Sequence, residues 1–72
     1  MPNDYVSPIS KILQSLDPGT PFESITVQGT IKAVRILAAY HEETNCATFI
    51  HADGNLEIVN CNEIACFELR NV

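Results

Sequence analysis

Apolar residues near the start of the chain are spaced as on one face of a helix. They stand at i, i+3, i+4 and i+7, and they are Ile9, Ile12, Leu13 and Leu16. Ser7-Pro8 suits the start of a helix and Asp17-Pro18-Gly19 suits its end. We therefore expect a helix over residues 7–17, after a loose arm at residues 1–6. The apolar stripe should pack on the rest of the chain, and the residues expected to face away from it are Ser10, Lys11, Gln14 and Ser15.

From Phe22 onward the apolar positions alternate with a period of two, which predicts β-strands. The expected strands cover 22–28, 31–40 and 46–51, followed by two strands within 55–69 that a short break at 60–63 separates. Within 31–40 the apolar positions change from odd to even numbers after Ala33, which predicts a bulge or a sharp bend there. Asp53-Gly54 predicts a tight hairpin before the last two strands.

This order predicts a mainly β domain with one N-terminal helix. Five short strands fall within residues 22–70, and connections of two to five residues make neighbouring strands antiparallel. A long bent strand lets one sheet curl, so we expect a five-stranded antiparallel small barrel of the SH3 type. An open α+β sheet with the same helix is the alternative. The 72 residues form a single domain.

The charge balance favours some partners over others. The chain carries nine acidic and four basic residues, a net charge of −5, which opposes binding to phosphate backbones and favours a basic protein surface. Glu42 and Asp53 are candidate partner-facing acids. Three cysteines, no signal-peptide pattern at the start and no apolar run of ~18 residues predict a cytoplasmic protein with free thiols and no membrane contact.

Catalytic and metal chemistry find little support. His41-Glu42-Glu43 and His51-Ala52-Asp53 combine acid and base types, but both fall at expected hairpin ends, where polar residues face water. Cys61 and Cys66 lack the close pairing of strong zinc sites. We expect no enzyme activity, no metal and no cofactor.

The second half of the chain resembles a known family in its motif spacing. The segment Ile58–Leu69 runs as an apolar pair, Asn60, Cys61, a polar pair and an apolar strand, and His41 stands four residues before Asn45 in the second hairpin loop. This pattern is similar to the two motifs of Sm/LSm proteins, the small barrels of RNA-associated rings. The resemblance covers roughly residues 22–70 and implies that His41, Glu43, Asn45, Asn60 and Cys61 occupy the positions of the family's RNA pocket.

Four of these positions depart from the family pattern: His41 stands where the family has an aspartate, and the other three changes bear on RNA binding. Glu43 replaces a stacking side chain, Asn60 replaces a cation and Cys61 replaces a glycine, so the fold can carry over without the uridine pocket. Small acidic Sm-like inhibitors of the bacterial Rho termination factor also resemble this chain in size, charge and N-terminal helix. The shared residues are Asn3-Asp4-Tyr5, Pro8-Ile9 and Ile64–Phe67.

The resemblance also implies self-association. The last two strands, Asn55–Leu69, would expose hydrogen-bonding edges, and Sm-like subunits assemble by pairing such edges. Phe67 and Leu69 are candidate interface residues of a homo-oligomer. We therefore expect a non-enzymatic interaction module that binds a basic protein surface. An RNA- or single-stranded-nucleic-acid-binding ring is the main alternative, and a phage or mobile-element protein of unknown activity is a further one.

Overall fold

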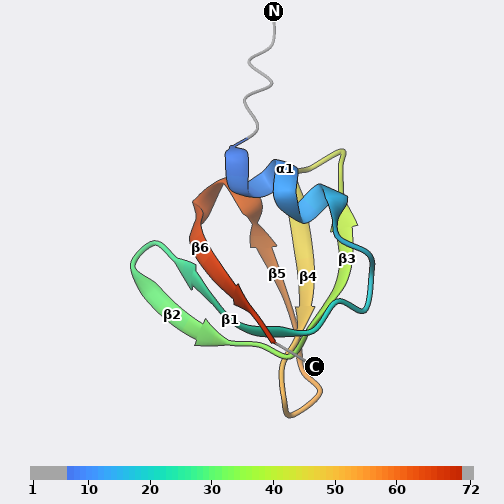
Figure 1. Cartoon of the computed structure of the whole chain (residues 1–72), viewed down its shortest axis with the longest axis vertical. Helices are drawn as coiled ribbons and strands as arrows, with labels where there is room; N and C mark the ends of the chain where they lie inside the picture. The colour runs from blue at the N-terminus through green and yellow to red at the C-terminus, as the bar shows by residue number, and fades with distance from the viewer. Residues whose placement is uncertain (1–6, 71–72) are drawn as a thin grey trace, which may run out of the picture.

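One helix, a short 3-10 turn and six strands make up the computed structural model, which describes residues 7–70 (Figure 1). The arm expected at residues 1–6 lies outside the described residues. In chain order the elements are α1 Pro8–Ser15, β1 Phe22–Val27, β2 Thr30–Ala33, β3 Ile36–His41, β4 Cys46–Ile50, β5 Leu56–Asn60, η1 Cys61–Glu63 and β6 Ile64–Leu69.

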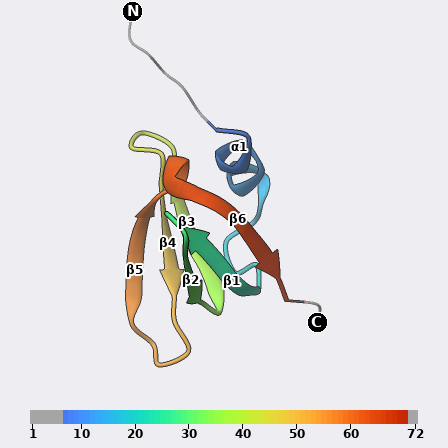
Figure 2. The same ribbon diagram turned by 90° about the vertical axis from the view of Figure 1, so that its left-hand side faces the viewer.

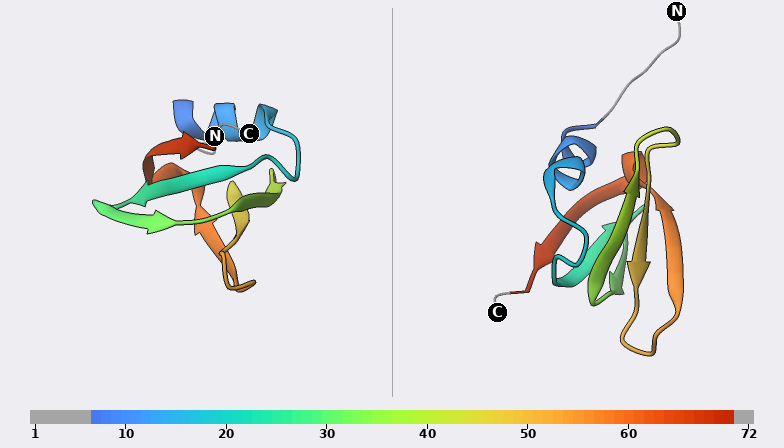
Figure 3. Two further views of the ribbon diagram at one scale, coloured as in Figure 1. Left: turned by 60° about the horizontal axis from the view of Figure 1, so that its bottom comes forward. Right: turned by 90° about the vertical axis from the view of Figure 1, so that its right-hand side faces the viewer.

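The strands form two three-stranded antiparallel sheets. One sheet has the order β2-β1-β6 and the other β3-β4-β5. The two sheets face each other at a steep angle, and the β4–β5 hairpin projects beyond them (Figure 2; Figure 3, left). The expectation of a mainly β chain with one N-terminal helix is confirmed.

The long strand expected over 31–40 is interrupted, so that it contributes β2 to one sheet and β3 to the other. The break lies at Val34-Arg35, directly after the predicted bend at Ala33. Val34 turns into the core, and the backbone of Arg35 joins the two sheets. Its N–H donates to the carbonyl of Ile50 at 2.8 Å, and its carbonyl accepts from the N–H of Phe22 at 2.7 Å.

The last strand pairs with the first, as closure of the expected barrel would require. β6 runs antiparallel to β1, with Ile25 opposite Phe67 and Thr26 opposite Cys66. The closed five-stranded barrel is nevertheless wrong: residues 7–70 form six strands in two separate sheets. The physical reason is that η1 leads β6 from the end of β5 onto the other sheet, so β5 and β6 are not hydrogen-bonded neighbours.

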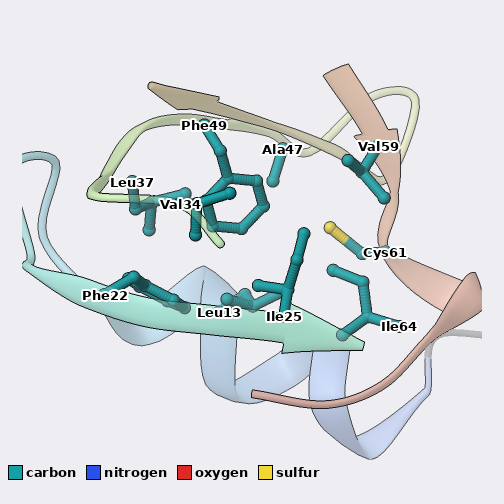
Figure 4. Close-up of a cluster of buried hydrophobic side chains, with 10 residues drawn as sticks. All are labelled: Leu13, Phe22, Ile25, Val34, Leu37, Ala47, Phe49, Val59, Cys61 and Ile64. Carbon is teal, nitrogen blue, oxygen red and sulfur yellow. The ribbon is translucent and has the colours of Figure 1, made fainter. Parts of the chain in front are cut away.

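The hydrophobic core fills the space between the two sheets and the helix (Figure 4). Its members are Leu13, Phe22, Ile25, Val34, Leu37, Ala47, Phe49, Val59, Cys61 and Ile64. The ring of Phe22 meets that of Phe49 edge-on, with 5.2 Å between the centroids. Ala47 and Phe49 share the buried face of β4, as their alternation predicts.

The helix is shorter than expected and covers one end of this core (Figure 1). Ser7 is its N-cap and Pro8 its first residue, as predicted, whereas the helix ends at Ser15 rather than at residue 17. Leu13 is fully buried, but Ile12 of the same expected stripe is 48% exposed. The prediction that Ser10 faces away from the core side is wrong, because Ser10 is fully buried between α1 and η1.

Candidate functional site

Four of the five Sm-pocket positions meet where the β3–β4 turn approaches the start of η1. His41 lies opposite Cys46 in the β3–β4 ladder, and Cys46 lies opposite Asn60 in the β4–β5 ladder. The N–H of Cys61 donates to the carbonyl of Asn45 at 2.9 Å. The structure therefore brings together residues that stand about twenty positions apart in the sequence.

Asn45 uses its side chain within the protein. Its backbone has φ +55°, a left-handed conformation that asparagine tolerates better than most residues. The Tyr40 hydroxyl donates to Asn45 Oδ1, while the buried Asn45 Nδ2 has no hydrogen-bond partner within residues 7–70. Burial, and then the nearby Cys61, Glu42 and Cys46, raise the pKa of Tyr40, so its phenol stays protonated and able to donate.

Cys61 replaces the family's glycine with a buried thiol. Its side chain is fully buried in the core, and burial, with a smaller contribution from Cys46, raises its pKa to about 11. At neutral pH this thiol stays protonated, and a protonated, enclosed thiol is a poor nucleophile. All three cysteines are free, as expected, but they differ in burial: Cys46 is half-buried and Cys66 is exposed.

Asn60 stands where the family carries a cation, and it performs a local structural task. Its Oδ1 accepts from the N–H of Asn62 at 3.0 Å and so caps η1. Asn62 Oδ1 in turn accepts from the N–H of Ser7 at 3.0 Å and from the hydroxyl of Ser10 at 3.2 Å. These bonds hold the helix against η1, and the sequence analysis missed both Ser10 and Asn62. Asn62 lies within the expected break at 60–63 and Ser10 on the expected polar side of the helix, so the periodic pattern pointed to neither.

The two candidate partner-facing acids, Glu42 and Asp53, and the pocket-position Glu43 lie at the turns that bound the β3–β4–β5 sheet. Glu42 and Glu43 are exposed in the β3–β4 turn, and Asp53 is exposed in the β4–β5 turn. Asp53 accepts at 3.0 Å from both the backbone N–H and the side-chain amide of Asn55, which shapes that turn. Among the described residues, the ion pairs involve other carboxylates, those of Glu23 and Glu57. The charges of the turns are therefore open to a partner.

The two histidines occupy separate places. His41 Nε2 lies 3.0 Å from Thr48 Oγ1 on the exposed side of the β3–β4 ladder. His51 lies in a network that joins the two sheets: its Nδ1 is 3.0 Å from the carbonyl of Ala33 and its Nε2 is 2.7 Å from Glu57 Oε1. The two histidines therefore contact different groups at different ends of β4.

Lys32 completes the network from β2 and was missed by sequence reasoning. Its Nζ donates to Glu57 Oε2 at 2.6 Å. Hydrogen bonds from Lys32 and then His51 lower the pKa of Glu57, against a smaller opposing effect of burial. No spacing along the chain pointed to Lys32, because β2 and β5 belong to different sheets.

The candidate interface residues lie on β6. Phe67 is half-buried, and its ring lies 5.2 Å from that of Phe22, so it contributes to the core. Leu69 is exposed and stands opposite Phe22 in the β1–β6 ladder. Of this pair, Leu69, at 48% exposed, offers more of its surface to a partner.

Comparisons with known proteins leave the family open, because no family model matches the sequence and no curated protein or solved structure matches it significantly. Across residues 7–70 no helix is long and apolar enough to cross a bilayer. The same part of the chain holds no group of three His, Cys, Asp or Glu side chains arranged for a metal ion.

Proposed function

We propose that this protein is a non-enzymatic, Sm-like interaction module that binds a basic protein surface through Glu42, Glu43 and Asp53. One observation carries the proposal: these carboxylates are exposed at the turns of a single sheet, and no described cation neutralises them. Unpaired charges of one sign at the ends of one sheet favour a partner of opposite charge and speed its approach.

The Sm-like assignment is supported by the order of the elements. A helix precedes the strands, a bent strand passes from one sheet to the other, and a 3-10 turn leads to a last strand that pairs with the first. The Sm-pocket positions also gather at one place, although Glu43 and Asn60 supply no positive charge there. This combination favours an Sm-like scaffold in which other contacts replace those of an RNA pocket.

We further propose that the chain forms homo-oligomers in the cytoplasm. Among the described residues, β5 and β6 each pair on one side only, so each leaves an edge for another chain. Leu69 is exposed beside the β6 edge, and Phe67 would extend the contact toward the core. Three free thiols fit a reducing compartment. Light scattering tests the oligomer, since a pentamer-to-heptamer mass would support a ring and a monomer would refute self-association.

A charge-reversal experiment tests the binding proposal. Glu42, Glu43 and Asp53 are changed together to Lys, and binding to a fluorescein-labelled polylysine peptide is measured at low salt. Three such changes move the net charge from −5 by +6 to about +1, so a control of equal charge is needed. The control changes Asp17, Glu23 and Glu68 to Lys, away from the β3–β4–β5 sheet.

The proposal expects the turn variant to lose binding and the control to retain most of it. An equal loss of peptide affinity in both variants would show that net charge alone determines binding, and it would refute a local site. The competing function is RNA binding, favoured by the meeting of His41, Asn45 and Asn60. Micromolar affinity for a U-rich or A-rich oligonucleotide, falling steeply as salt is added, would make RNA binding the better-supported function.

A further inference from the structure

The outer face of the β3–β4–β5 sheet carries two rows of mainly apolar side chains, while its third row, next to the β3–β4 turn, holds His41, Cys46 and Asn60. The ladder register places Ile36, Ile50 and Leu56 in one row across the three strands. The next row holds Ala39, Thr48 and Ile58. Leu56 is 66% exposed and Ile58 is 68% exposed, while the alternate residue Val59 points into the core at 6%.

No described element covers this face. The helix and the β2-β1-β6 sheet lie on the opposite side of β4 and β5 (Figure 2; Figure 3, right). An antiparallel sheet with one solvated face normally alternates between apolar and polar residues, whereas strands covered on both faces read as nearly continuous apolar runs. β3 reads Ile-Leu-Ala-Ala-Tyr before His41, and β5 carries Leu56, Ile58 and Val59 within five residues. The two apolar rows are therefore more typical of a covered sheet face than of a solvated one.

The charges around this face indicate which kind of partner covers it. Its apolar rows lie between the β3–β4 turn, with Glu42 and Glu43, and the β4–β5 turn, with Asp53. A second copy stacked on this face would bring its own acidic turns, with Glu42, Glu43 and Asp53, against those of the first and be repelled there. A partner with an apolar middle and basic ends would satisfy both the sheet face and the turns.

The dimensions of the sheet suggest the shape of that partner. β4 has five residues, about 17 Å of strand, and an α-helix of about eleven residues has the same length. Sheets commonly bury an apolar face against the apolar stripe of a helix. We infer that the outer face of β3–β4–β5 docks an amphipathic helix of another protein, about three turns long, with Lys or Arg at both ends. This inference rests on the proposed function and assigns it a contact surface.

The test uses a synthetic helix-forming peptide with a Leu/Ile stripe over eleven residues and two Lys or Arg at each end. Its matched control keeps the stripe and carries Glu at the ends. Binding to the full chain is followed by fluorescence anisotropy, and backbone NMR shifts locate the contact. The protein variants are Leu56→Ser with Ile58→Ser, and Ile31→Ser, an equally exposed isoleucine (73%) on β2 as the control.

The inference expects the basic peptide to bind the native chain and the Ile31→Ser control alike. It expects NMR shifts on β4 and β5, no binding of the Glu peptide, and an affinity about 10- to 100-fold weaker in the Leu56/Ile58 variant. Because all three changed side chains are exposed, folding should be preserved, and circular dichroism confirms this for each variant.

Two results would overturn the inference without touching the proposed function. In the first, the Leu56/Ile58 variant binds the peptide as well as the native chain does, while the Glu42/Glu43/Asp53 variant does not bind it. The acidic turns, and not the apolar face, would then form the contact. The second is a native dimer that the Leu56/Ile58 changes convert to a monomer, which would identify a second copy as the occupant. No binding of the basic peptide at millimolar concentration, or shifts on β4 and β5 caused by an oligonucleotide, would also overturn it.

Discussion

Leu13 and Ile12 are neighbours on the same helix, and replacing each by Ala should have very different effects on stability. Leu13 is fully buried in the core between the sheets, whereas Ile12 is 48% exposed. Removing a buried leucine side chain costs about 3 kcal/mol, within the 2–5 kcal/mol found for such sites. The exposed isoleucine should cost less than about 1 kcal/mol, since much of its surface is already in water.

The size of the domain makes this difference easy to measure. A chain of 72 residues has a free energy of unfolding of roughly 4–11 kcal/mol, so Leu13→Ala removes a large fraction of it. In a domain of this size each kcal/mol shifts the Tm by about 4–8 °C, which predicts a fall of roughly 12–24 °C. Alanine has the higher helix propensity, so any loss reflects packing and not a weaker helix.

Urea unfolding followed by circular dichroism gives the free energy of unfolding of the native chain and both variants. The Leu13 variant should unfold at a much lower urea concentration with little change in slope. Equal and small losses in both variants would mean that the helix does not pack on the sheets, and the account of the core would be refuted. Equal and large losses would mean instead that Ile12 is buried, for example by another chain.

Three further predictions concern single side chains. The pKa of Glu57 is held below its ordinary value of 4.5, so its contacts stabilise the fold fully above that pH and lose this effect as the pH falls through the lowered pKa. The urea midpoint of the native chain should therefore fall between pH 6 and pH 3. Glu57→Gln should reduce that fall, whereas Glu68→Gln, at an exposed position, should not. A thiol reagent at pH 8 should modify Cys66 quickly and spare Cys61, whose buried thiol has a pKa of about 11, until the chain unfolds; rapid labelling of Cys61, located by mass spectrometry, would contradict its burial. Because the backbone of Asn45 has φ +55°, the Asn45→Ala variant should be about 1 kcal/mol less stable than the Asn45→Gly variant in thermal melting. Equal stability of the two variants would argue against a left-handed backbone at this position.

Part of the candidate site was predictable from the sequence because it depends on local patterns. Ser7-Pro8 predicted the helix start, and alternation placed Ala47 and Phe49 on the buried face of β4. Turn chemistry placed Asp53 in an exposed hairpin. Each of these features depends on residues within a few positions of one another.

The network of Lys32, His51 and Glu57 was not predictable in the same way. Its members come from β2, from the end of β4 and from β5, and they meet only because the two sheets face each other. The contact of Asn62 with Ser7 and Ser10 likewise joins residues more than fifty positions apart. Spacing along the chain carries no information about such pairs.

The amino-acid sequence by itself determined the helix, the approximate strands, the turns and the acidic balance of this protein, because periodicity and turn chemistry act over a few residues. Only the tertiary structure decided that the chain breaks at Val34-Arg35 into two sheets, and that Val59 faces the core while Leu56 and Ile58 face outward. Alternation along a strand shows which residues share a face. When both faces carry apolar residues, contacts between distant segments decide which face is buried. The outward face that results is the surface on which the inferred helix would dock.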